Sequence, residues 1–97
     1  MSVYYKLKMK IGNYIYYGRL TLNISGNSVN GIIEYKNMKS VFYNGIIRNN
    51  EIEFSGKFKM FLHKINYIAK GSFNNDRIRI IATTNRGDFE ITGICEK

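Results

Sequence analysis

The stretch NGIIRNNEIEFSG, residues 44–56, decides the fold. Two apolar runs flank Asn49-Asn50, and the second run alternates strictly between apolar and polar side chains, which is the period of a β-strand. Asparagine tolerates the positive φ that a two-residue hairpin loop requires. The stretch therefore predicts a β-hairpin, in which Gly45 and Gly56 both fall on the apolar face of a strand.

The same alternation continues along the chain, without helical periodicity. It predicts eight strands, at residues 3–11, 14–25, 28–36, 40–48, 51–60, 64–74, 77–85 and 88–96. Two-residue loops are predicted at Gly12-Asn13, Gly26-Asn27, Asn49-Asn50, Asn75-Asp76 and Arg86-Gly87, a three-residue loop at residues 37–39, and a turn of unassigned type at 61–64. With these loops, apolar residues face apolar residues across the hairpins, as a shared buried face requires.

Six glycines fall on the predicted inner face, one in each of six strands: Gly18, Gly31, Gly45, Gly56, Gly71 and Gly93. A glycine inside a strand orders a flexible residue and packs no side chain, so it destabilises the strand. It also lets a sheet coil sharply, because no side chain collides on the concave side. The glycines therefore predict a sheet that is curved into a small barrel.

Charges predict how the barrel closes. Asp88 and Glu90 point outward on the last strand, and Lys6, Lys8 and Lys10 point outward on the first. Pairing of these two strands would bring opposite charges together and leave no free sheet edge. We therefore expect an all-β fold, an eight-stranded antiparallel up-and-down β-barrel (a meander) formed by residues 1–97 as a single domain. Such a barrel is just wide enough to be filled by side chains or to hold one small ligand.

Four stretches together resemble small bacterial calycin-like barrels, which are related in shape to lipocalins and streptavidin. They are LTLNISGNSVNGIIEY, NGIIRNNEIEFSGKFK, INYIAKGSFNNDRIRIIATT and RGDFEITG. The matching positions are Leu20, Leu22, Gly31, Gly45, Phe54, Gly71, Asp76, Phe89 and Gly93. These positions mark turns, kinks and core, so the resemblance implies a calycin- or streptavidin-like fold and brings no functional residue with it.

The chain is strongly basic, with a net charge of +8 from 15 basic and 7 acidic residues. Such a charge suits a polyanionic partner. A candidate polyanion-binding face lies on the outer side of three consecutive predicted strands, at Lys57, Lys59, Lys64, Lys70, Arg77 and Arg79. The abundance of Ile, Asn and Lys, with no Pro or Trp, is also typical of an AT-rich coding sequence, and this would leave part of the charge without a function.

Residues that carry chemistry are scarce. The predicted inner face holds no Asp, Glu, Lys, Arg or His, whereas acid–base catalysis needs titratable groups that converge in one pocket. The single His63 and the single Cys95 do not make a metal site, and no cofactor motif occurs. We therefore expect a protein that is not an enzyme and holds no cofactor or metal.

The expected location is the cytoplasm. One cysteine cannot form an internal disulfide, and the start of the chain has no secretory pattern. The apolar runs are far shorter than a membrane span, so no membrane partner is expected.

Tyrosines and exposed apolar residues supply the candidate binding sites. Inward tyrosines either fill the barrel or orient a small, mostly apolar ligand with their hydroxyl groups, and the candidates are Tyr16, Tyr35, Tyr43 and Tyr67. An outward apolar patch at Ile32, Phe42 and Ile46 is a candidate interface for a homodimer or a protein partner. The predicted function is a non-enzymatic binding module for a small apolar ligand or a protein partner, with nucleic-acid or polyanion binding through the basic face as the alternative.

Overall fold

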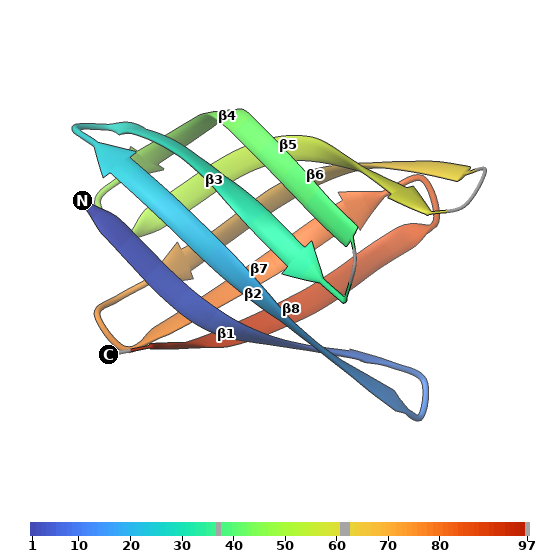
Figure 1. Cartoon of the computed structure of the whole chain (residues 1–97). Helices are drawn as coiled ribbons and strands as arrows, with labels where there is room; N and C mark the ends of the chain where they lie inside the picture. The colour runs from blue at the N-terminus through green and yellow to red at the C-terminus, as the bar shows by residue number, and fades with distance from the viewer. Residues whose placement is uncertain (37, 61–62, 97) are drawn as a thin grey trace.

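The computed structural model describes residues 1–36, 38–60 and 63–96 and forms a closed antiparallel barrel (Figure 1). The strands are β1 (Ser2–Ile11), β2 (Tyr14–Ser25), β3 (Ser28–Tyr35), β4 (Met38–Arg48), β5 (Glu51–Met60), β6 (His63–Phe73), β7 (Arg77–Thr84) and β8 (Gly87–Cys95). Each strand pairs with its neighbours in the sequence, and β8 pairs with β1. The predicted eight-stranded up-and-down barrel is confirmed. No described segment forms a helix with the length and apolar character needed to cross a bilayer.

Loop residues set the register of most hairpins as predicted. Gly12, Gly26 and Asn49 adopt left-handed φ values of 59°, 61° and 56°, as two-residue hairpin loops require. The resulting cross-strand pairs include Ile11 with Tyr14, Ile24 with Val29, Ile47 with Ile52 and Phe73 with Ile78. Each of these pairs was expected from the positions of the loops alone.

The loop between β7 and β8 lies one residue earlier than predicted. Thr84 pairs with Gly87, so the loop residues are Asn85 and Arg86. The Thr84 hydroxyl explains the shift, because it accepts a hydrogen bond from the Arg86 N–H and donates one to the Gly87 carbonyl. Phe89 consequently pairs with Ala82 in place of Thr84, a two-residue change that keeps the ring on the inner face.

Two other predicted turns also differ. Tyr35 pairs with Met38, so a two-residue loop replaces the predicted three-residue loop at 37–39, and Lys36 takes the positive φ of 53°. Residue 37 lies outside the described residues, as do residues 61 and 62 of the turn predicted at 61–64. His63, which was assigned to that turn, begins β6 and pairs with Met60.

A bulge in β4 reverses the predicted orientation of two aromatic residues. Phe42 is only 2% exposed and points inward, whereas Tyr43 is 82% exposed and points outward. The β3–β4 register shifts between the pair of Val29 with Gly45 and the pair of Gly31 with Phe42. The alternation used for prediction therefore holds on only one side of the bulge, and the inward placement of Tyr43 and the outward placement of Phe42 were wrong.

Five of the six inner glycines lie so close to a neighbouring strand that an added Cβ would meet its backbone, and at Gly56 it would meet side chains. A Cβ atom at position 71 would overlap the carbonyl oxygen of Arg79, and one at position 18 would lie 2.5 Å from that of Glu34. Gly31 has a further role, because a Cβ there would lie 2.7 Å from Cζ of Phe42. The space above Gly31 thus accommodates the Phe42 ring that the bulge turns inward.

Backbone pairing closes the barrel, through Tyr5 with Cys95, Leu7 with Gly93 and Met9 with Ile91. The charges contribute differently from the prediction. Glu90 forms an ion pair with Arg79 of β7, at 2.6 Å, in place of the β1 lysines.

Candidate functional site

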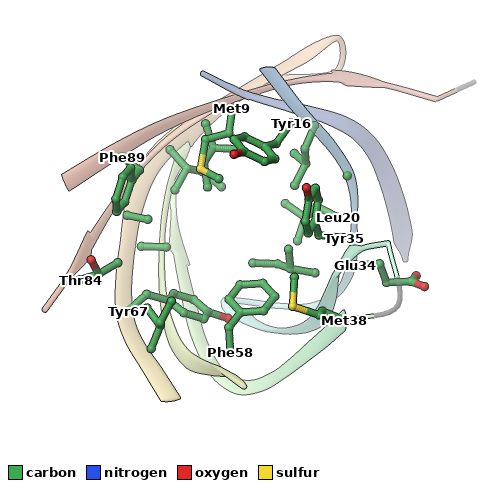
Figure 2. A pocket seen from close by; sticks show the side chains of 18 of the residues that line it. Met9, Tyr16, Leu20, Glu34, Tyr35, Met38, Phe58, Tyr67, Thr84 and Phe89 are labelled. Atoms are coloured by element: carbon green, nitrogen blue, oxygen red, sulfur yellow. The ribbon is translucent and has the colours of Figure 1, made fainter. Parts of the chain in front are cut away.

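The two ends of the barrel differ in how well they are filled. At the end where β1, β3, β5 and β7 begin, here called the closed end, the core is solid, and its residues include Leu22, Val29, Ile47, Ile52 and Ile78. At the end where the same strands finish, here called the open end, an apolar cavity of about 310 Å³ enters the barrel (Figure 2). Its wall includes Met9, Tyr16, Tyr35, Met38, Phe58, Ile65, Tyr67, Thr84 and Phe89.

Aromatic rings form part of the boundary between the cavity and the solid core. Phe42 stacks on Phe54 with 4.0 Å between ring centroids and 16° between planes. The Phe54 and Tyr67 rings meet edge to face. The ring centroids of Tyr67 and Phe58 lie 5.5 Å apart. Phe54, Tyr67 and Phe58 line the cavity, whereas Phe42 lies behind them. The bulge in β4 is therefore part of what builds the cavity floor.

The floor carries one buried polar pair. The hydroxyl groups of Ser40 and Tyr67 lie 2.9 Å apart, and both residues are buried. Burial raises the pKa of Tyr67 above its ordinary value of 10.0, and the hydrogen bond with Ser40 acts in the opposite direction. Gly56 makes room for this pair, since a Cβ there would overlap the Tyr67 hydroxyl. Tyr67 is therefore a neutral hydroxyl at physiological pH.

Two further tyrosines lie on the cavity wall nearer to its opening. Tyr16 and Tyr35 meet edge to face, with 5.5 Å between centroids, and both are half-buried. The Lys36 ammonium lies 5.5 Å from the Tyr35 ring centroid, within the range of a cation–π contact. Neither hydroxyl group forms a hydrogen bond with another described residue. Both hydroxyl groups are therefore available to form hydrogen bonds with a bound ligand.

Three of the four tyrosines proposed as ligand contacts thus line one cavity, and Tyr43 does not. The sequence analysis proposed only tyrosines as ligand contacts and did not include the apolar residues of the cavity wall. Met9, Met38, Phe58 and Phe89 line the cavity (Figure 2). The inner-face positions of Met9, Phe58 and Phe89 were available from the same alternation, whereas Met38 was assigned to the predicted loop at 37–39. Ser40 was missed for a different reason, because only the bulge turns it inward.

Charged groups lie only at the edge of the cavity. Glu34 and Arg86 are the charged residues among those that line the cavity in the described chain, and the Glu34 carboxylate points away from it (Figure 2). Within the described residues, no cluster of His, Cys, Asp and Glu could hold a metal ion. Cys95 is half-buried near the closed end and does not line the cavity. The described cavity wall therefore offers hydrogen-bonding hydroxyl groups and apolar contact.

The predicted basic face is interrupted by carboxylates. Lys70 lies 3.8 Å from Glu53 of β5, and Arg79 pairs with Glu90 of β8. Lys57, Lys59 and Lys64 belong to the part of the β5–β6 hairpin near the open end, whereas Arg77 begins β7 at the closed end. The six residues do not form one continuous basic surface.

The predicted apolar interface is also incomplete. Phe42 is buried, Ile32 is half-buried, and Ile46 is exposed. Val41 and Tyr43 are exposed beside them on the outer face of β4.

The chain matches no protein-family model, and a search of curated proteins finds no match to it. The fold and the cavity alone define its class, which is an eight-stranded β-barrel with one closed and one open end.

Proposed function

We propose that the protein is a non-catalytic binding module that takes a small apolar ligand through the open end of its barrel. The observation that carries this proposal is the cavity of about 310 Å³ with an apolar wall. Ligand pockets begin at about 300 Å³ and combine an apolar lining with a few well-placed polar groups. The hydroxyl groups of Tyr16, Tyr35 and Tyr67 provide such polar groups from three sides.

The shape of the cavity favours a ligand that is mostly apolar with one or two hydrogen-bonding atoms. Aromatic rings form part of its floor and two methionines lie on its wall, and the flexible methionine side chain adapts its shape to a ligand. Among the described lining residues, the charged Glu34 and Arg86 lie only at the edge of the cavity, which supports binding without catalysis. A calycin-like relationship is part of the same proposal and is supported by the eight-stranded meander. A cytoplasmic location is supported by the single cysteine, which has no disulfide partner in the chain.

Binding of nucleic acid or another polyanion is the weaker proposal. Ion pairs with Glu53 and Glu90 already engage two of the six basic residues proposed for it. The polyanion proposal would become the stronger one if the protein bound single-stranded nucleic acid, if this binding weakened steeply with salt, and if neutralising Lys57 and Lys64 abolished it.

A matched pair of variants tests the ligand proposal. Ala82 is buried on the cavity wall, and Thr83, the next residue, is exposed on the outside of the same strand. Ala82→Leu should weaken saturable binding of the apolar dye Nile red by about tenfold, because the added side chain occupies the cavity. Thr83→Leu should leave dye binding unchanged.

Native mass spectrometry supplies the second measurement. Protein purified from its own cells should carry a bound small molecule, and Ala82→Leu should lose it. Equal dye binding by both variants, together with no bound molecule, would overturn the proposal.

A further inference from the structure

The β1–β2 hairpin extends beyond the wall of the barrel at the open end (Figure 1). Its own ladder continues to the pair of Ile11 with Tyr14. By contrast, the pairs of β1 with β8 end at Met9, and those of β2 with β3 begin at Arg19. Residues 10–18 therefore form a two-stranded ribbon whose two faces are both open to solvent near its tip.

This ribbon carries an unusual concentration of exposed apolar and aromatic side chains. Tyr14 is 72% exposed and Tyr17 is 66% exposed, and Ile11 and Ile15 are also exposed. By the alternation of a β-strand, Ile11 and Tyr14 fall on the face that continues the inner side of the barrel, whereas Ile15 and Tyr17 fall on the opposite face. Clustered exposed apolar groups mark an interaction surface, and tyrosine favours an interface with one wet and one apolar side.

Lysines accompany these side chains. Lys10 pairs across the ribbon with Ile15, and Lys8, at the base of the ribbon, pairs with both Tyr17 and Thr92 of β8. A second hairpin, β5–β6, projects from the same end (Figure 1) and carries the exposed Lys57 and Lys64. None of these four lysines forms an ion pair with another described residue. The two hairpins therefore present free positive charge on two sides of the cavity opening.

Acidic residues reduce this charge only in part. Glu34 of β3 and Asp88 of β8 lie near the same end, together with Lys36, Lys39 and Arg86. The open end therefore keeps a net positive charge.

We propose that the open end docks on an anionic lipid surface, with the tip of the β1–β2 ribbon in the head-group region. Tyrosine and isoleucine would bury their apolar parts there, while lysines from both hairpins contact lipid phosphates. This docking turns the cavity opening toward the membrane. The absence of an apolar span argued against a membrane partner, but a surface contact needs no span.

Other occupants fit the ribbon less well. A second copy of the chain would bring the same positive charge to the contact and would be repelled. A nucleic-acid strand could not stack its bases on both Tyr14 and Tyr17, because these rings lie on opposite faces of the ribbon. A planar anionic surface satisfies the lysines of both hairpins and the exposed tip together.

Vesicle flotation of the purified full chain tests the docking. The protein should bind phosphatidylcholine vesicles that contain phosphatidylglycerol, bind phosphatidylcholine alone far more weakly, and dissociate as salt rises. The double change Lys8→Gln with Lys10→Gln should lower the affinity by about 25-fold, since each lysine near such a surface contributes about fivefold. The double change Tyr14→Ser with Tyr17→Ser should lower it by about tenfold.

Matched controls keep the test specific. Tyr43→Ser removes an exposed tyrosine from the barrel wall, and Arg77→Gln removes an exposed charge from the closed end, so both should keep the wild-type affinity. Ala82→Leu should also keep it, which separates docking from ligand binding in the cavity. The proposal is overturned if anionic vesicles bind no protein, if the controls lose as much affinity as the ribbon variants, or if the ribbon variants instead abolish self-association measured without lipid.

Discussion

The closed and open halves of the barrel use similar apolar residues and reach different outcomes. In the closed half, Leu22, Val29 and Ile52 are fully buried in a continuous core. In the open half, Met9, Tyr16 and Phe89 are only half-buried around a cavity. Hydrophobic patterning alone therefore does not decide whether a barrel is filled.

Hydrogen bonds between successive hairpins hold the closed end together. Three loops at the closed end each accept a hydrogen bond from a later strand. The Asn27 carbonyl accepts from the Ile47 amide, the Asn50 carbonyl from the Phe73 amide, and the Asp76 carbonyl from the Cys95 amide. The Tyr5 hydroxyl adds a bond to the Asn74 carbonyl, at 3.0 Å. At the open end, the β1–β2 hairpin instead extends past its neighbours. The closed half is therefore expected to supply most of the stability and the open half the binding surface.

Core truncation should give the largest contrast between the halves. Leu22→Ala should lower the free energy of unfolding by about 3 kcal/mol, because it leaves a void in a solid core. Met38→Ala, on the cavity wall, should cost about 1 kcal/mol, because its side chain is already only half-buried. Urea unfolding measures both. Equal losses would show that the two halves are equally well packed.

Replacing inner glycines with alanine should produce a smaller difference in stability between the two halves. Gly71→Ala should cost about 2 kcal/mol, because its Cβ would meet the backbone of β7, which can yield only if the sheet moves. Gly56→Ala should cost less, about 1 kcal/mol, because its Cβ would meet the Tyr67 side chain, which has the cavity beside it. Thermal unfolding compares the two. A larger loss of stability for Gly56→Ala than for Gly71→Ala would contradict the expectation that side chains in the open half can shift to make room.

Much of the fold was predictable because the informative signals were local. Alternation identified the strands, and loop residues such as Gly12 and Asn49 set the register of their hairpins. The β4 bulge was not predictable in this way. The segment VFYN offers an aromatic residue to either face, and the choice depends on the space above Gly31, which lies in another strand.

The cavity was predictable only in part. Tyr16, Tyr35 and Tyr67 were correctly placed on the inner face, but the pattern is equally apolar in both halves and contains no signal for an unfilled end. The projection of residues 10–18 depends on where β3 and β8 stop pairing with the first hairpin. That is a property of several strands together.

The buried hydroxyl pair should make stability depend on alkaline pH. Because burial raises the pKa of Tyr67, the unfolded chain ionises first as pH rises past 10.0. The contribution of Tyr67 to stability is thus fully present below that pH and is lost as pH rises through the folded-state pKa. At neutral pH, Tyr67→Phe should cost about 1.5 kcal/mol, because the Ser40 hydroxyl loses its partner.

The difference in free energy of unfolding between the wild type and Tyr67→Phe should become smaller above pH 10, since phenylalanine cannot ionise. Urea unfolding at a series of pH values measures it. Burial also raises the pKa of Tyr5, so the variant keeps some alkaline sensitivity. A difference that stays constant across the alkaline range would exclude Tyr67 as a cause.

The smallest expected effect concerns the junction of β4 and β5. The backbone pairs there run from Ile46 with Glu53 to Arg48 with Glu51, and toward the open end the Asn44 side chain donates to the Ser55 hydroxyl and accepts from its amide. Asn44→Ala should cost about 1 kcal/mol. It should also speed hydrogen exchange at the Ser55 amide without a matching change in the closed half.

Asn23→Ala is the matched control for this junction. Asn23 also exchanges side-chain hydrogen bonds with its neighbours, Ser2 and Asn30, but it lies within an unbroken ladder in the closed half. Its loss should leave local exchange rates nearly unchanged, because the backbone pairs on both sides remain. If both variants speed exchange equally, the junction at Asn44 is no weaker than the rest of the barrel.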